Sequence, residues 1–316
     1  MFWLISRRLK KHNVSTIQTT ETAPEMLKSH SKMKDFTLLL KLRLSWLVVF
    51  SAVTAYIMAH FFYDQPINWS SVIILTFGGF LVTGSSNAIN QIIEKDLDKL
   101  MTRTENRPMP QERLTNLEAI IFSVLTGLTG VFLLWFFLNP LSGILGLSAL
   151  LSYAAVYTPL KRISPFAVFV GAFPGAIPPM LGWVALTGEI SLQALILFAI
   201  QFIWQFPHFW ALAWMMDEDY KKAGFLMLPA ADGRSKTSAF QIMVYTAGII
   251  PIGLLPYMFN MTGWVSAIIT SLCGVYFMFR AIKLHNSLEI SDARKLLYAS
   301  FIYLPIVQLA LLFDTL

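Results

Sequence analysis

The sequence predicts an all-α, polytopic integral membrane protein with nine transmembrane helices. Hydrophobic residues make up 56% of the 316 residues and charged residues only 13%, whereas soluble domains carry roughly 25% charged residues. Apolar runs long enough to cross a bilayer recur along the chain. The basic residues are confined to alternate breaks between these runs, which is the pattern of a membrane topology.

The apolar runs are separated by short polar breaks. Glycine and proline interrupt several runs, as in GAFPGAIPPMLGW, and membrane helices tolerate this where neighbours satisfy the freed backbone groups. The predicted spans are residues 43–62, 71–92, 117–137, 140–157, 166–186, 192–214, 240–258, 263–281 and 296–313.

The placement of charge predicts the orientation. If the N-terminus lies in the cytoplasm and the loops alternate sides, all 24 Lys and Arg residues fall in the N-terminal segment or in cytoplasmic loops. The loops on the other side, and the final residues FDTL, contain none. This follows the positive-inside rule and predicts an odd number of spans, with the C-terminus outside. It also explains the formal charge of +6 without a nucleic-acid partner.

Residues 1–34 are predicted to form a cytoplasmic N-terminal tail, because four basic residues near the start precede a polar Thr/Ser-rich run. Residues 35–316 are predicted to form the membrane domain. The basic tail is expected to touch anionic lipid. The single cysteine, Cys273, lies in an apolar run, which excludes a disulfide framework.

The polar stretch after the second span carries the first candidate site. Asn90, Glu94 and Asp98 are spaced i, i+4 and i+8, so on a continuing helix they project from one stripe. Asp96 falls on another face. Carboxylate and amide oxygens are the hard ligands that Mg²⁺ prefers. The stretch therefore predicts a magnesium site.

Arginines follow these carboxylates at once, in T-R-T-E-N-R-P. Arg103 and Arg107 can fork onto phosphate oxygens. A metal-binding stripe beside arginines is what a diphosphate site requires. The alternative is a solvated, charge-alternating loop, but the one-faced oxygen triad favours the functional interpretation.

Two further cytoplasmic loops carry candidate residues. Lys161 and Arg162, in YTPLKRISP, either anchor helix ends at the lipid surface or clamp an anion. After the sixth span, Asp219 is placed to join the oxygens of the first motif, because both lie at cytoplasmic helix ends. Tyr220 and Lys222 follow it. The alternative is that these residues only end a helix in solvent.

His208 is a polar residue inside the sixth span, in WQFPHF. Intramembrane polar residues face the bundle or a cavity. His208 and Asp219 are eleven residues apart, about 16 Å on a continuous helix, so they cannot share one metal ion. The interpretations are an iron ligand and a structural group that donates to a carbonyl freed by Pro207.

These motifs resemble the UbiA superfamily of intramembrane prenyltransferases. The stretch Asn90-x3-Glu94-x3-Asp98 with RTENRP resembles its first aspartate-rich motif. The stretches YTPLKR, WQFPHFWALAW and DYKKAGFLMLP, in that order, are similar to the haem-farnesylating branch, the protohaem IX farnesyltransferases. The resemblance covers the chain from about Leu38 onward and makes residues 35–316 an intramembrane prenyltransferase domain.

The resemblance implies transfer of a farnesyl group from farnesyl diphosphate to a vinyl group of haem B, giving haem O, in the cell inner membrane. It implies Mg²⁺ as the cofactor, with haem B as a substrate, and a central apolar cavity that shields the farnesyl cation from water. Haem A synthase and oxidase assembly factors are expected partners besides the lipid bilayer; no nucleic acid is expected.

The resemblance and the residue chemistry together assign the candidate site. The catalytic residues are Asn90, Glu94, Asp98, Asp219 and Tyr220, and the metal ligands are Asn90, Glu94, Asp98 and Asp219. The diphosphate-binding residues are Arg103, Arg107, Lys161, Arg162 and Lys222, and the haem-binding residue is His208.

The chain also departs from the superfamily pattern. Glu94 stands where the superfamily usually has Asp, and a full second DxxxD motif is missing around Asp219. Two alternatives remain open: a UbiA-type enzyme with a quinone or chlorophyll-type acceptor, and a membrane transporter. A transporter is expected to place ionisable groups within its spans, whereas only Asp64, Glu189 and Asp314 among the carboxylates lie away from the cytoplasmic side.

Overall fold

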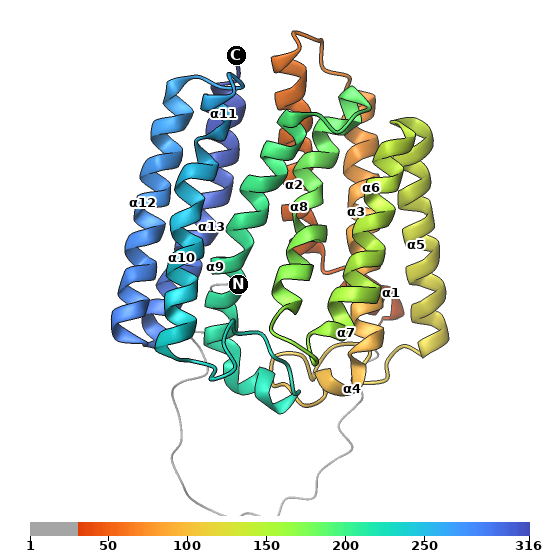
Figure 1. The fold of residues 1–316 in the computed structure, drawn as a ribbon. Coiled ribbons are helices and arrows are strands. Elements are labelled where there is room, and N and C mark those ends of the chain that lie inside the picture. Colours follow the sequence, from red (N-terminus) through yellow and green to blue (C-terminus); the bar gives the residue numbers. More distant parts are fainter. Residues whose placement is uncertain (1–30) are drawn as a thin grey trace, which may run out of the picture. The chain divides into compact units, whose positions relative to one another are not determined.

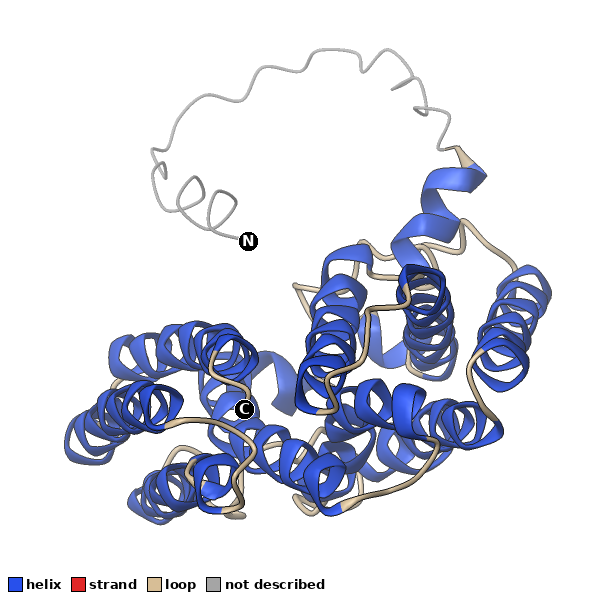
Figure 2. Ribbon diagram, turned by 90° about the horizontal axis from the view of Figure 1, so that it is seen from above, coloured by secondary structure: helices blue, strands red, loops and turns tan. Residues whose placement is uncertain are grey.

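The structure is a computed structural model and describes residues 31–316. Helices form the whole framework, and among the described residues the only β pairing is an isolated bridge between Thr262 and Thr315. The unit Lys32–Leu316 is built from upright helices, which Figure 1 shows from the side and Figure 2 end-on. Residues 1–30 of the predicted tail lie outside the described residues.

The elements are α1 (Lys32–Leu39), α2 (Leu42–Phe62), α3 (Trp69–Ile93), α4 (Lys95–Asp98), α5 (Asn116–Phe137), α6 (Pro140–Leu151), η1 (Ser152–Tyr157), α7 (Thr158–Leu160), α8 (Ala167–Thr187), α9 (Leu192–Lys222), α10 (Lys236–Gly253), α11 (Leu255–Met258), α12 (Trp264–Ser287) and α13 (Ile290–Phe313).

Nine segments in the described part of the chain are long and apolar enough to span a membrane, as predicted. The fourth span joins α6, the π-helix η1 and α7, and the seventh joins α10 and α11. The ends of α9 and α12 extend beyond the predicted spans, because charged and polar residues continue the helix past the apolar run. The chain is therefore a multi-pass membrane protein.

Local signals start the spanning helices. Asn68, Thr115, Asn139, Ser191 and Ser235 each occupy the N-cap position and accept a hydrogen bond from a backbone N–H of the first turn. Such caps satisfy donors that the helix leaves free. At Thr115, Glu118 also bonds back to the cap, which completes a capping box.

The helices pack in two groups. In the first, α2 contacts α3 and α8, α3 contacts α5, and α6 contacts α5 and α8; in the second, α9, α10, α12 and α13 pack on one another. The contacts α8–α9 and α2–α13 join the groups. Gly182 permits the close approach of α2 and α8, because a Cβ atom there would lie 1.9 Å from the carbonyl oxygen of Ala52.

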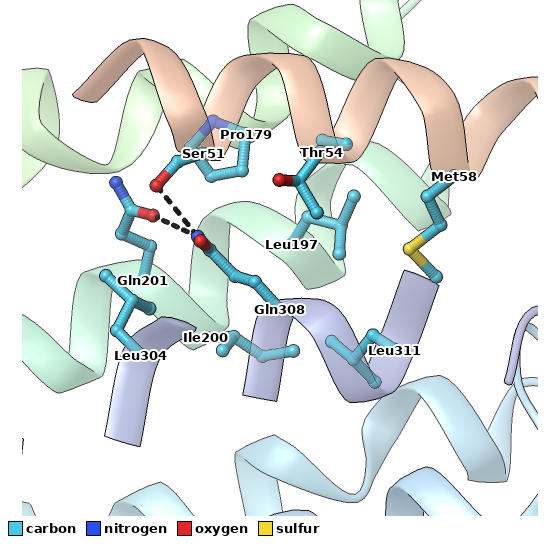
Figure 3. Close-up of a pocket in the computed structure, with 11 residues that line it drawn as sticks. Ser51, Thr54, Met58, Pro179, Leu197, Ile200, Gln201, Leu304, Gln308 and Leu311 are labelled. Atoms are coloured by element: carbon cyan, nitrogen blue, oxygen red, sulfur yellow. Dashed lines mark hydrogen bonds between the residues drawn. The ribbon is translucent and has the colours of Figure 1, made fainter. Parts of the chain in front are cut away.

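Side-chain amides hold the junction of α2, α8, α9 and α13. Gln308 donates to Ser51 Oγ (2.8 Å) and to Gln201 Oε1 (3.0 Å), as Figure 3 shows. Gln201 in turn donates to the carbonyl oxygen of Gly175 (2.7 Å). Pro179 has no N–H to reach this carbonyl four residues back, so Gln201 supplies the missing donor. The predicted central cavity is small here, about 20 Å³.

The helix ends and loops that carry the candidate site lie at the same end of the bundle. Figure 1 places α4 and α7 at one end of the bundle, at the bottom of the view, and the C-terminus at the opposite end. The loops after the second and fourth spans therefore face the same side. This is the arrangement that the distribution of basic residues predicts.

Candidate active site at one end of the helix bundle

The first acidic motif lies where α3 passes into α4. Regular helix is interrupted at Glu94. The N–H of Glu94 still donates to the carbonyl oxygen of Asn90 (3.0 Å), and the N–H of Asp98 donates to that of Glu94 (2.7 Å), so the helical register continues. Asn90, Glu94 and Asp98 are consequently all buried, whereas the Asp96 side chain is 74% exposed. The predicted stripe, with Asp96 pointing away, is confirmed.

Each carboxylate of the stripe is paired with a predicted cation. Lys161 Nζ lies 2.9 Å from Glu94 Oε1, and Arg107 Nη1 lies 2.7 Å from Asp98 Oδ2. Both carboxylates are buried. Since breaking a buried pair leaves an uncompensated charge, these contacts lock the two loops onto the end of α3.

The loop that carries Arg107 is anchored at both ends. Thr104 Oγ1 donates to the carbonyl oxygen of Asp98 (3.0 Å), and Arg113 Nε donates to Asp35 Oδ1 of α1 (2.9 Å). Asp35 is 1% exposed. The helix α1 therefore buttresses the site, and Met109 of the loop packs with Leu39 of α1 in one apolar cluster.

Lys161 reaches Glu94 because the π-helix η1 and the short helix α7 direct the chain towards α3. π-Helical turns recur at functional sites. Lys161 Nζ lies 4.6 Å from the centroid of the Tyr157 ring, and Gly171 leaves room for that ring, since a Cβ atom would lie 2.6 Å from it. Burial alone would lower the pKa of Lys161, but the Glu94 carboxylate, together with Tyr153 and Tyr220, raises the pKa above its ordinary value.

Asn90 also joins the fourth span. Its Nδ2 donates to Thr158 Oγ1 (3.3 Å), and Thr158 donates to the carbonyl oxygen of Tyr153 (2.9 Å). The stripe is thus fixed at two levels, through Asn90 and Glu94, to the segment that supplies Lys161.

Lys41 belongs to the site although the sequence analysis treated it only as a topological charge. It lies between α1 and α2 with φ 47° and ψ 56°, in the left-handed region that non-glycine residues rarely adopt. Burial, followed by the charges of Arg107 and Lys161, lowers its pKa from 10.5 to about 7. Its ammonium has no hydrogen-bond or ion-pair partner within residues 31–316. A left-handed backbone conformation at a non-glycine residue is typical of functional positions.

The turn at Lys41 is held by three contacts. Gln91 Nε2 donates to the carbonyl oxygen of Leu39 (2.9 Å), and Ser45 Oγ donates to that of Leu40 (2.8 Å). The Leu40 side chain packs directly on Gly84, where a Cβ atom would lie 2.6 Å from it. The position of Lys41 is therefore set by α3.

Asp219 of the second acidic motif reaches the loop that follows the first motif, but within the described residues its carboxylate does not form a metal-binding group with those of Glu94 and Asp98. Asp219 pairs with Lys222 (3.1 Å) at the end of α9. Its carboxylate also interacts with the backbone N–H groups of Thr102 and Arg103. Tyr220 lies near Lys161 through Phe225. The ring centroids of Tyr220 and Phe225 are 6.0 Å apart, and Lys161 Nζ lies 5.7 Å from the centroid of the Phe225 ring.

Arg162 does not reach the carboxylates and remains exposed. It lines an open cavity of about 470 Å³ together with Glu94, Thr158 and apolar residues of α3 and α7. Pockets of roughly 300–1,000 Å³ accommodate small-molecule ligands. Arg162 thus stands at the edge of the Glu94 site.

His208 lies apart from these charges. The helix α9 is continuous from Leu192 to Lys222, so the predicted separation of His208 from Asp219 holds. His208 Nδ1 contacts Ser300 Oγ of α13 (2.7 Å). Within residues 31–316 the hydrogen-bond partner of the ring is this hydroxyl and not a carbonyl freed by Pro207, which is the structural alternative that the sequence suggests.

The stripe also fits a hard cation. Asp98 Oδ1 is buried and has no hydrogen-bond partner in the described part of the chain, although Oδ2 of the same carboxylate binds Arg107. An unpaired buried carboxylate oxygen is costly unless a cation completes it. Among the described residues, no three Asp, Glu, His or Cys side chains cluster as a ready metal site, and Glu94 and Asp98 are instead paired with Lys161 and Arg107.

Comparison with known proteins agrees with this arrangement. Residues 48–304 match the model of the UbiA prenyltransferase family. A curated relative from Cytophaga hutchinsonii, named protoheme IX farnesyltransferase, is 47% identical over 284 residues, which cover 90% of this chain and 98% of the relative.

Solved structures share the fold. One, described as that of a digeranylgeranylglyceryl phosphate synthase, superimposes with a TM-score of 0.75 at 21% identity and covers 90% of this chain and 98% of the other. A UbiA homologue from Archaeoglobus fulgidus, bound to GPP and Mg²⁺, gives a TM-score of 0.67 at 14% identity and covers 88% and 99%. The nine spans, the paired acidic motifs and these matches lead to one conclusion: the chain belongs to the UbiA prenyltransferase family.

Proposed function

We propose that this chain transfers a farnesyl group from farnesyl diphosphate to a vinyl group of haem B, which gives haem O. The observation that carries the proposal is the cluster of Lys41, Arg103, Arg107 and Lys161 around two buried carboxylates. The relative from Cytophaga hutchinsonii that bears the name protoheme IX farnesyltransferase supports the choice of substrates.

The cluster is suited to a diphosphate because positive charge exceeds negative charge. Glu94 and Asp98 balance Lys161 and Arg107, and within residues 31–316 this leaves Lys41 and Arg103 without a carboxylate partner. An incoming diphosphate supplies that charge, and the arginine forks provide directed donors to its oxygens. Lys222 and Arg162 stand at the edge of the same group.

Mg²⁺ is the proposed cofactor, held by Asn90, Glu94, Asp98 and Asp219. Two structures of a UbiA homologue from Archaeoglobus fulgidus contain Mg²⁺, one with GPP and one with DMAPP. When bound, the ion neutralises charge on the diphosphate oxygens. Lys161 and Arg107 then exchange part of their contact with the carboxylates for contact with the phosphates.

The side chains of the site assist departure of the diphosphate. As the allylic C–O bond breaks, negative charge grows on the leaving oxygens, and the cationic groups of Lys41, Arg107 and Lys161 would stabilise that charge. The farnesyl carbon forms a bond to the vinyl group of haem B. The cation left on that group takes up water and releases a proton, which accounts for the hydroxyl group of haem O. The Tyr157 and Tyr220 rings border the site and exclude bulk water.

His208 is the proposed haem-binding residue, because a neutral imidazole is a common iron ligand. It lies on α9 between the charged motifs and the amide junction at Gln201. The porphyrin is a substrate at this position.

The proposed location is the cell inner membrane with residues 1–34 as a cytoplasmic tail and 35–316 as the catalytic domain. Haem A synthase and oxidase assembly factors are the proposed partners.

A transporter is disfavoured by the position of the buried charges. Within the described residues, the buried carboxylates are Asp35, Glu94, Asp98 and Asp217. All belong to segments on the cytoplasmic side of the predicted topology, and the polar groups at the amide junction are uncharged. A transmembrane ion path requires ionisable groups within the spans.

The rate of diphosphate release shows which acceptor the protein uses. Purified protein with Mg²⁺ and farnesyl diphosphate is supplied with haem B or with a quinone-type aromatic acceptor. The proposal expects release that depends on haem B. Release that depends only on the aromatic acceptor would assign the chain to another branch of the family.

A further inference from the structure

The imidazole of His208 is held by its neighbours from two helices. The Trp204 indole stacks on it, with centroids 4.5 Å apart and planes 19° apart. Trp204 Nε1 also donates to the carbonyl oxygen of Ser300 (2.9 Å), and Ser300 Oγ lies 2.7 Å from His208 Nδ1. The edge of Phe301 closes another side of the ring. The orientation of the imidazole is thereby fixed.

The hydrogen bonds of Ser300 also determine where the imidazole proton lies. Ser300 Oγ lies 2.6 Å from the carbonyl oxygen of Leu297, and a carbonyl can only accept. The single hydroxyl hydrogen of Ser300 is therefore committed to Leu297. The contact between His208 Nδ1 and Ser300 Oγ then needs a hydrogen from the ring, so Nδ1 carries the proton and Nε2 carries the lone pair.

His208 lies about two helical turns along α9 from the central junction at Gln201. His208 follows Gln201 by seven residues on the continuous helix α9, which places it about 20° from Gln201 in azimuth and about 10 Å further along the axis. Gln201 contacts Gln308 at the junction that Figure 3 shows. Nε2 of His208 has no hydrogen-bond partner in residues 31–316, and, unlike Nε2 of His60, it is not sealed from open space.

We propose that Ser300 is a positioning residue that fixes His208 as the Nδ1–H tautomer and so presents the Nε2 lone pair to the iron of the porphyrin acceptor. The inference rests on the proposed function, since it takes haem as the ligand. An N–H that donates from the far side of an iron- or zinc-bound imidazole orients the ring and raises its basicity. Ser300 supplies the acceptor for that bond from α13.

The tautomer is measured first, without haem. Full-length protein in lipid nanodiscs, with ¹⁵N-labelled histidine, is examined by NMR, and His208→Gln identifies the signal. The wild type is expected to show a protonated Nδ1 and an unprotonated Nε2. A protonated Nε2 in the wild type would overturn the proposal.

The second measurement follows haem binding by the Soret band. Ser300→Ala is expected to weaken haem binding about 10-fold and to shift the Soret band, while farnesyl diphosphate binding stays at the wild-type level. Ser300→Thr keeps a hydroxyl and is expected to restore both. Ser123→Ala is the matched control, because Ser123 is also fully buried and donates to a carbonyl of its own helix.

The variants separate this inference from the proposed function. In one outcome, His208→Ala changes the Soret band of bound haem while Ser300→Ala binds haem like the control Ser123→Ala. In that case Ser300 has no positioning role and His208 remains the ligand. If His208→Ala leaves the haem spectrum unchanged, both the ligand assignment and the role of Ser300 fail. Loss of haem binding in Ser300→Ala with rescue by Ser300→Thr supports the proposal.

Discussion

Lys161 and Glu94 form a buried ion pair, with Nζ 2.9 Å from Oε1, between segments 67 residues apart in the chain. The pair connects the first acidic motif to the loop after the fourth span. A second pair, Asp98 with Arg107, lies one helical turn further on. Together they hold two predicted metal ligands and two predicted diphosphate donors in one place before any substrate arrives.

Neutralising the stripe is expected to stop turnover. Glu94→Gln and Asp98→Asn each remove one charged ligand, and we expect each to lower kcat by about 100-fold or more. Asp96→Asn serves as the control, because Asp96 points to solvent. Equal losses in all three variants, measured as rates at saturating substrate, would contradict the helical-stripe assignment.

Glu94→Gln also tests the ion pair itself. The variant leaves Lys161 buried without a counter-charge, so thermal stability is expected to fall. Adding Lys161→Met removes the stranded charge and is expected to recover stability without recovering activity. Recovery of activity in the double variant would show that neither residue contacts the substrate.

Arg107→Lys separates the guanidinium fork from simple charge. Lysine keeps the positive charge that the topology needs, but it cannot bind two oxygens in a planar fork. We expect normal membrane insertion and a KM for farnesyl diphosphate raised about 10-fold, with the KM for haem unchanged. Arg280→Lys is the control, because Arg280 lies on α12 and donates to Tyr276 rather than to a residue of the charge cluster. Wild-type kinetics in Arg107→Lys would reduce Arg107 to an anchor.

Lys41 gives the site a dependence on pH. Its pKa is lowered to about 7 by burial and by Arg107 and Lys161, against the opposing charge of Glu94 and with Arg103 adding to the lowering. Below this pKa the ammonium is charged and attracts diphosphate; above it the amine is neutral. The KM for farnesyl diphosphate is thus expected to rise by up to about 10-fold between about pH 6.5 and about pH 8.

Lys41→Arg is the matched variant for that profile, because arginine stays protonated throughout the range. The ratio of KM values at the two pH values is expected to fall toward one in Lys41→Arg. A ratio equal to that of the wild type would show that another group controls the pH dependence.

The topology is tested at the C-terminus. All basic residues lie on one side of the predicted topology, so Leu316 is predicted to lie outside the cytoplasm. A reporter that is active only in the cytoplasm is expected to be silent when fused after Leu316 and active when fused after Arg162. Activity at both positions would contradict the assignment.

The spans and the stripe could be predicted from the sequence because both depend on local periodicity. Runs of apolar residues identify membrane helices, and the i, i+4, i+8 spacing identifies the face that Asn90, Glu94 and Asp98 share. The meeting of Asp219 with the loop at Arg103 followed from the topology, since both segments end on one side.

The remaining parts of the site depend on contacts between distant segments. Lys41 looked like one topological charge among many, because nothing local marks its left-handed turn or its approach to Arg107. Likewise, no spacing connects His208 with Ser300, which lie 92 residues apart on α9 and α13.

The most direct test of the central claim is the mass of the porphyrin after purified protein is incubated with Mg²⁺, farnesyl diphosphate and haem B. The account predicts a product in which one vinyl group carries a farnesyl chain and a hydroxyl group, and it predicts that Glu94→Gln protein forms almost none. Unmodified haem B from a wild-type protein that binds both substrates would contradict the account.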